Sequence, residues 1–130
     1  MDDNRATLPK SERLSWKRHV DTLFAHGSSF VAYPLRIIYF PIKNDHREAN
    51  VSILIHVPKK KLKHAVDRNF VKRRIRENYR LRKHALDNVF TDGGQSLLLA
   101  FLYLDGKPST FATLGRAMEK ALKTLCERLK

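Results

Sequence analysis

The chain has 130 residues, of which 42% are hydrophobic, and this length and composition are typical of one folded domain with a single core. Lysine and arginine number 26 against 13 acidic residues, so the formal net charge of +13 favours a nucleic acid over an acidic small molecule as the partner. The sequence has no apolar run of membrane-spanning length, no secretory signal pattern and a single cysteine. We therefore expect a cytoplasmic protein with no membrane partner and no small-molecule substrate.

The N-terminal part of the sequence predicts an arm and one helix. Residues 1–11 are polar and lack periodicity, so we expect a flexible arm followed by a single domain over residues 12–130. Apolar residues at helical spacing predict a helix from about Ser15 to His26, which Gly27 is placed to end. Phe24 is an aromatic residue of this helix, and its spacing alone favours packing on the core.

The next part of the chain predicts strands. Residues 28–42 are rich in β-branched and aromatic residues, and Pro34 interrupts them, which predicts either two short strands or one broken strand. Residues 50–57 predict a further strand. Its alternation gives two faces, one with Ile53, Ile55 and Val57 and the other with Ser52, Leu54 and His56. Both faces are partly apolar, so both should be covered, either by one helix on each face or by both helices on one.

The most strongly charged segment, residues 66–84, predicts an amphipathic helix that residues 85–90 finish. Basic residues recur at intervals of four and form one stripe, which consists of Arg68, Lys72, Arg76 and Arg80, flanked by Asn69, Arg73 and Lys83. The predicted core face on the opposite side consists of Phe70, Val71, Ile75, Tyr79 and Leu86. Like charges at this spacing repel one another, so the stripe indicates a polyanionic partner.

The start of this helix is predicted at Asp67, a favourable N-cap, with Val66 packing against Val71 as a hydrophobic staple. This assignment places Arg68 and Asn69 in the first turn, where free N–H groups favour a phosphate. Before the helix, residues 58–64 form a lysine-rich connector that could follow a nucleic-acid backbone through charge alone.

The C-terminal part of the sequence predicts a strand and a helix. Residues 91–94 are a turn, and residues 96–104 are a nearly continuous apolar run, as in a buried central strand. Ser109 or Thr110 can cap the last helix. Its predicted apolar face consists of Leu114, Met118, Ala121, Leu122, Leu125 and Leu129.

The sequence offers no catalytic constellation of its own. Its six histidines are not in a metal-ligand pattern, and its carboxylates are scattered among turns and helix ends rather than clustered as two-metal cleavage requires. It also lacks a phosphate-binding glycine loop and a nucleophile elbow. We therefore expect no catalytic residue and no metal site in the protein itself.

The basic helix resembles that of one family, the protein subunit of bacterial ribonuclease P. The family motif is Arg-Asn-Arg followed by a hydrophobic residue, Lys, Arg, two variable residues and Arg. Residues 68–76 of this chain read Arg-Asn-Phe-Val-Lys-Arg-Arg-Ile-Arg. Phe70 replaces the second arginine of the motif, and Arg74 stands where the family often has an aliphatic residue. The resemblance extends over most of the chain.

The resemblance implies a fold. The expected fold class is α+β, a single-domain α/β sandwich with the element order α-β-β-β-α-β-α, similar to a domain of ribosomal proteins. The crossover around the basic helix would be left-handed, although the general tendency for such connections is right-handed.

The resemblance also implies a function. The chain would be an accessory subunit, while the ribonuclease P catalytic RNA, which binds most of the Mg²⁺, removes the 5′ leader of precursor tRNA. Residues that would dock on the catalytic RNA are Arg68, Asn69, Lys72, Arg73 and Arg76. Residues that would line the cleft for the single-stranded leader are Phe24, Ser52, Leu54, His56, Pro58 and Lys59. Val20 occupies a second leader-stacking position of the family, where an aromatic residue would stack better.

Three other classes of function remain open on the sequence. A structural RNA-binding protein of ribosomal type would share the fold and the charge but would lack the leader cleft. A free-standing protein nuclease would need a carboxylate cluster that the sequence does not show. DNA binding through the basic helix is less favoured, because an exposed sheet face suits a single strand better than a duplex groove.

Overall fold

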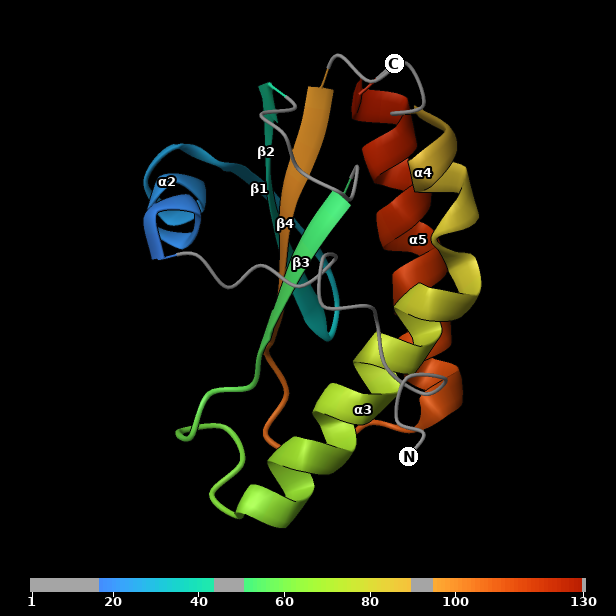
Figure 1. Ribbon diagram of the computed structural model, residues 1–130. Coiled ribbons are helices and arrows are strands. Elements are labelled where there is room, and N and C mark those ends of the chain that lie inside the picture. Colours follow the sequence, from blue (N-terminus) through green and yellow to red (C-terminus); the bar gives the residue numbers. More distant parts are fainter. Residues whose placement is uncertain (1–16, 44–50, 90–94, 130) are drawn as a thin grey trace, which may run out of the picture.

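A computed structural model describes residues 17–43, 51–89 and 95–129 of the chain. The predicted arm, the turn at 91–94 and most of the polar turn after residue 43 lie outside these ranges. The described elements are α2 (Lys17–His26), β1 (Ser28–Ala32), β2 (Leu35–Lys43), β3 (Val51–His56), α3 (Ala65–Arg82), α4 (His84–Val89), β4 (Gln95–Tyr103) and α5 (Phe111–Leu129). Of these helices, α2 lies on one side of the sheet, and α3, α4 and α5 lie on the other (Figure 1). The α+β class and the element order predicted above are confirmed.

The sheet has four strands in the order β1-β2-β4-β3. β1 and β2 form an antiparallel hairpin whose turn contains the cis peptide bond between Tyr33 and Pro34. The β-rich stretch is therefore two strands. β4 pairs with β2 on one side and with β3 on the other, and Leu97, Leu98 and Leu99 in it are completely buried. The apolar run is thus the buried central strand that the sequence predicted.

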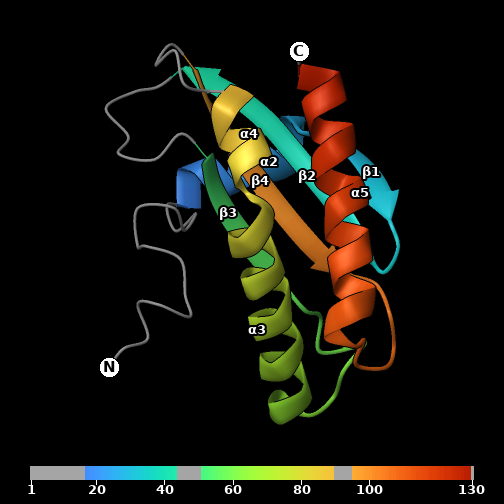
Figure 2. The same ribbon diagram turned by 90° about the vertical axis from the view of Figure 1, so that its right-hand side faces the viewer.

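The two faces of the sheet carry two separate cores. The smaller core joins Leu23 of α2 to Leu98 and Ala100 of β4. The larger core lies between the other face of the sheet and the helices α3, α4 and α5 (Figure 2). The first helix and the basic helix therefore cover opposite faces, which the sequence alone left open.

The connection between β3 and β4 has an uncommon hand. These two strands are parallel neighbours, and the chain passes from one to the other through α3 and α4. Figures 1 and 2 together show that this path turns in the left-handed sense. Most crossovers between parallel strands are right-handed, so the family resemblance predicted the hand better than the general tendency did.

The basic segment forms two helices instead of the single helix that the sequence predicted through residue 90. α3 ends at Arg82, and Lys83, with φ of −70° and ψ of −13°, separates it from α4. The amide of Leu86 donates to the carbonyl of Lys83 at 3.0 Å, which tightens the chain by an i to i+3 bond. This break lets Leu86 reach complete burial in the larger core.

The contact between α3 and α5 is built around a buried amide. The Asn78 side chain donates to the carbonyls of Arg74 and Phe111 at 3.0 and 3.2 Å, and its Oδ1 accepts from Arg82 at 2.7 Å. Gly115 faces this amide, because a Cβ added to it would lie 3.0 Å from Asn78 Oδ1. The two helices therefore cross closely where one of them has no side chain.

The start of α5 is fixed by hydroxyl groups. The Thr113 amide donates to Thr110 Oγ1 at 3.1 Å, so Thr110 is the capping residue of the two that the sequence allowed. The Ser109 hydroxyl instead pairs with the Tyr103 hydroxyl at 2.7 Å. Burial raises the pKa of Tyr103, which remains a neutral hydrogen-bonding group in the core.

Candidate nucleic-acid interface

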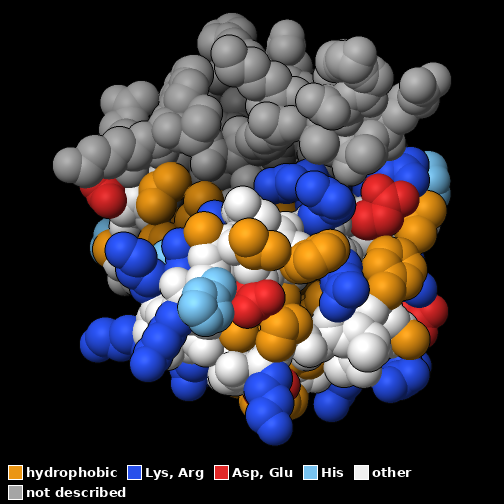
Figure 3. Space-filling model, turned by 90° about the horizontal axis from the view of Figure 1, so that it is seen from below, with side chains coloured by type: hydrophobic (Ala, Val, Ile, Leu, Met, Phe, Trp, Pro, Cys, Tyr) orange, Lys and Arg blue, Asp and Glu red, His pale blue; other side chains and the backbone are white. Residues whose placement is uncertain are grey.

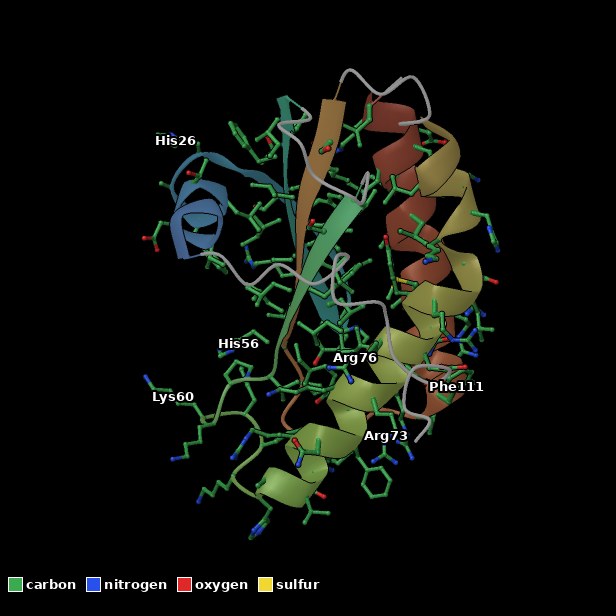
Figure 4. The ribbon with its side chains drawn as sticks, viewed as in Figure 1. His26, His56, Lys60, Arg73, Arg76 and Phe111 are labelled. Carbon is green, nitrogen blue, oxygen red and sulfur yellow. The ribbon has the colours of Figure 1, made fainter. Side chains whose placement is uncertain are left out.

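The outer surface of α3 carries the middle of the predicted basic stripe. Arg73 and Asn69 are exposed, and Lys72 and Arg76 are half-buried. In Figure 4, Arg76 lies on the side of α3 that faces His56 and the connector, whereas Arg73 lies toward Phe111. The stripe therefore wraps around the outer surface of the helix, and it presents cations to two sides of the molecule.

The helix starts earlier than predicted, and the predicted cap and staple are both wrong. α3 begins at Ala65, with His64 at the N-cap position and no side-chain capping bond. Asp67 lies inside the first turn, where its carboxylate still suits the positive end of the helix dipole. Val66 is 68% exposed, so it does not pack against Val71. Arg68 already begins the regular ladder, since its amide donates to His64 O at 3.1 Å.

The Arg68 side chain holds the connector that precedes the helix. One of its terminal nitrogens, Nη1, donates to the carbonyls of Leu62 and Lys63 at 2.9 and 2.8 Å. Such bonds from a charged donor are among the stronger hydrogen bonds in proteins. Arg68 therefore acts within the chain, as a tie between the first turns of α3 and the connector.

The connector is an ordered loop with a cationic outer surface. The amides of Lys61 and Leu62 donate to Pro58 O at 3.0 and 3.2 Å, and Leu62 is buried in the larger core. The lysines of the loop are exposed, namely Lys59, Lys60, Lys61 and Lys63. Because the backbone is fixed on its inner side, these lysines are presented together, and Lys60 projects away from the domain in Figure 4.

The C-terminal end of the stripe is neutralised by an acidic residue. Arg80 forms a salt bridge with Glu77 that includes a 3.1 Å bond from its Nε to Glu77 Oε1. This hydrogen bond holds the pKa of Glu77 below its usual value and raises that of Arg80. Arg80 is thus engaged in an ion pair with Glu77.

Phe70 is not part of the core face, contrary to the prediction. Its side chain is 48% exposed, and the guanidinium of Arg74 lies over its ring at 5.3 Å from the centroid. Arg74 also donates to Ser109 O at 2.7 Å, which ties this side of α3 to the segment before α5. The spacing of four between Phe70 and Arg74 was a signal of this pair that the sequence analysis did not use.

A second surface lies on the sheet face that α2 covers only in part. The strand register aligns Val31, Arg36, Leu102 and His56 in one row across all four strands. Val31, Arg36 and His56 are exposed, and Leu102 is half-buried. The sequence analysis missed Val31 and Arg36, because only the pairing register brings them beside His56.

The predicted leader residues are spread over this surface and its border. Phe24 on α2 is 46% exposed, and Leu54 is half-buried in the smaller core. Pro58 and Lys59 follow β3 into the connector, where Pro58 is half-buried and Lys59 is exposed. Ser52 is completely buried, so its side chain does not reach the surface.

The described part of the chain contains no group of three histidine, cysteine, aspartate or glutamate residues that could hold a metal ion. None of the helices described is long and apolar enough to cross a membrane.

Comparison with known proteins identifies a family, related sequences and solved structures. A model of the family described as Ribonuclease P matches residues 8–126. The Ribonuclease P protein component of Porphyromonas gingivalis is 43% identical over 115 residues, which span 88% of this chain and 83% of that protein. The Ribonuclease P protein component of Chlorobium phaeobacteroides is 34% identical over 110 residues, or 79% of this chain and 75% of the relative.

A solved structure shares the fold. The RNase P protein of Staphylococcus aureus aligns with a TM-score of 0.65 over 89% of this chain and 96% of that one. The two sequences are 22% identical in this alignment, so the likeness concerns the arrangement of the sheet and helices.

Proposed function

Because the chain belongs to the ribonuclease P protein family, we propose that it assists a catalytic RNA in removing the 5′ leader from precursor tRNA in the cytoplasm. The observation that carries this proposal is the basic surface formed by α3 and its connector. It is supported by the family match over residues 8–126. The steps below assign a task to each surface.

The outer surface of α3 would bind the catalytic RNA. Asn69, Lys72, Arg73 and Arg76 lie along it at helical spacing, and a rigid helix keeps their mutual distances fixed. Each phosphate that a cation neutralises releases counterions, so such a stripe supplies affinity that depends steeply on salt. Arg68 would contribute indirectly, because its guanidinium holds the lysine-rich connector in place.

The partly open sheet face would bind the single-stranded leader. Phe24 offers a ring for stacking, and His56 and Arg36 offer polar groups within one row of the sheet. Lys59 stands at the end of β3, where it can meet the backbone of the same strand. Unpaired bases stack on aromatic side chains with little sequence preference, which suits leaders of varied sequence.

The chemistry would come from the RNA subunit and its ions. Mg²⁺ stabilises the charge that develops on the phosphodiester during hydrolysis. We assign this ion to the RNA, as the resemblance to the family implies, and derive no protein step through it. The protein would hold the leader in register with the catalytic RNA and screen the repulsion between the two RNA backbones.

The test is cleavage of a precursor tRNA at near-physiological magnesium. Three reactions are compared, with the purified protein alone, with a bacterial ribonuclease P RNA alone, and with both. We expect cleavage at the leader junction that is much faster in the mixture than in either single reaction. Cleavage by the protein alone would show a protein active site, and an unstimulated mixture that still binds RNA would favour a purely structural RNA-binding role.

A further inference from the structure

An aromatic patch lies beside the basic stripe on the lower end of the molecule. We define this patch by Phe70, Arg74 and Phe111. Arg74 lies over the Phe70 ring and donates to Ser109 O, so it ties Phe70 to the segment that precedes Phe111. The Asn78 side chain donates to the Phe111 carbonyl at 3.2 Å, so the start of α5 is held along α3.

The patch is not explained by folding. Phe70 and Phe111 are 48% and 41% exposed, and neither belongs to the two hydrophobic cores. Single exposed apolar residues are common on protein surfaces, but the exposed Phe70 ring is stacked with an arginine that is itself held by a hydrogen bond to Ser109 O. Arg74 occupies one face of the Phe70 ring. The exposed remainder of the ring is available to a flat partner.

The charge around the patch favours a nucleic acid as that partner. Arg73 is exposed next to it, and Figure 3, which views this end of the molecule from below, shows hydrophobic side chains among lysine and arginine side chains that outnumber the acidic ones. A hydrophobic protein segment would have to bring many negative charges to match this border. An unpaired nucleotide provides both an apolar flat face and a phosphate in one unit.

We propose that Phe70 stacks on an unpaired base of the catalytic RNA, with Arg73 on an adjoining phosphate and Arg74 backing the ring. This inference rests on the proposed function and adds a contact of a different physical kind to it. Stacking on a neutral ring releases no counterions, so it should add affinity without changing the salt dependence of binding.

The test measures the affinity of the full chain for a bacterial ribonuclease P RNA at several salt concentrations. Four variants replace Phe70, two without an aromatic ring (Phe70→Ala and Phe70→Leu) and two with one (Phe70→Tyr and Phe70→Trp). We expect about a tenfold loss of affinity for alanine and leucine, which is the low part of the range known for base stacking, and an unchanged salt slope. Tyrosine and tryptophan should bind within about threefold of the parent chain, because they keep a flat ring.

Leu81→Ala is the matched control. Leu81 is a similarly exposed apolar residue of α3, but it lies eleven positions beyond Phe70 and outside the patch. Its truncation should leave RNA affinity unchanged. The thermal unfolding of every variant is measured as well, since loss of a half-exposed ring should not prevent folding.

The outcomes separate this inference from the proposed function. If the parent chain does not bind the RNA, the proposed function fails. If the parent chain binds but Phe70→Ala binds equally well, the stacking contact is overturned while the proposed function stands. It is also overturned if leucine serves as well as tryptophan, because simple apolar contact would then suffice.

Discussion

Arg68 belongs to the basic stripe by its spacing, but its guanidinium already has two partners within the chain. It bonds the carbonyls of Leu62 and Lys63, whereas Arg73, five residues further along α3, is exposed. A guanidinium donates in fixed directions within a plane, while an ammonium is a strongly hydrated point charge. The two arginines should therefore respond differently to replacement by lysine.

We predict that Arg68→Lys loses most of the affinity for the catalytic RNA that Arg68→Ala loses. The positive charge is kept, but the hydrogen bonds that order the connector are weakened. A hydrogen bond from a charged donor contributes about 1.5–3 kcal/mol to stability. Filter binding gives the affinity. Hydrogen exchange at the amides of Lys61 and Leu62, both bonded to Pro58 O, reports the order of the loop and should become faster.

Arg73 provides the control for that prediction. Arg73→Lys should bind the catalytic RNA nearly as well as the parent chain does. Arg73→Ala should lower the slope of log affinity against log salt concentration by about one. If Arg68→Lys binds normally and the connector amides exchange at the original rate, Arg68 acts as a simple charge and the positioning role is wrong.

The wrong predictions at single residues have physical causes. The cap at Asp67 and the staple at Val66 were assigned from local preferences, but the N-cap position lies three residues earlier, at His64, where the buried Leu62 and the Arg68 bonds fix the connector. Phe70 was placed on the core face because it is apolar. The polar Asn78 occupies that face, since its partners come from α3 and α5 together, and no local pattern shows this.

Within α3, Glu77 limits the reach of the basic stripe, because it pairs with Arg80. We predict that Glu77→Gln raises the affinity for the catalytic RNA and increases the log–log salt slope by up to about one, as Arg80 becomes free to meet a phosphate. Glu127→Gln on α5 makes the same change in net charge at an exposed position outside the stripe. An equal gain in both variants would show that only overall charge matters.

The same ion pair gives a pH dependence of known sign. Hydrogen bonding to Arg80 lowers the pKa of Glu77 from its usual 4.5. A carboxylate with a lowered folded pKa stabilises the fold above its usual pKa, and this contribution is lost as the pH falls through the lowered value. Because both side chains are partly exposed, the contribution should not exceed about 1 kcal/mol. Glu77→Gln should remove this part of the acid sensitivity in urea unfolding.

The crossing of α3 and α5 depends on the missing side chain of Gly115. Alanine is favoured over glycine in helices by about 1 kcal/mol, but its Cβ would lie 3.0 Å from Asn78 Oδ1 and 3.2 Å from Arg82 Nη2. Asn78 is held by three hydrogen-bonding partners and has little freedom to move. We predict that Gly115→Ala lowers the free energy of unfolding by about 1 kcal/mol, because overpacking outweighs helix propensity.

Chemical denaturation measures this change. Lys123 is exposed on the same helix, so a comparison of Lys123→Ala with Lys123→Gly gives the propensity difference of α5 without any new contact. If Gly115→Ala stabilises the protein by that same difference, the Asn78 side chain moves to make room for the added Cβ. The close crossing of α3 and α5 would then not require glycine at this position.

At the scale of the whole molecule, the sequence predicted the order of elements because most of them have a recognisable hydrophobic pattern. The apolar run of β4, the alternation of β3 and the apolar face of α5 are such patterns. The break at Lys83 and the distribution of the helices over the two sheet faces depend on contacts between distant segments. The row from Val31 to His56 likewise exists only once four strands are paired in register.

The fold also separates the two proposed RNA surfaces. The α2 side of the sheet carries Phe24 and the exposed row, while Arg73 of α3, which lies toward Phe111, is on the far side of the larger core (Figures 1 and 4). Because a packed sheet and core lie between them, a change on one surface should act on one RNA partner with little effect on the other.

We therefore predict that Phe24→Ala weakens binding of the assembled ribonucleoprotein to precursor tRNA by at least about fivefold, the low end of the loss of one stacked base. Binding of mature tRNA, which has no leader, and of the catalytic RNA should not change. Arg73→Ala should show the reverse pattern, with weaker assembly and an unchanged preference for the leader once the complex is saturated. Equal losses of affinity for precursor and mature tRNA in Phe24→Ala would mean that this ring does not contact the leader. It would then stabilise the fold or contact the catalytic RNA.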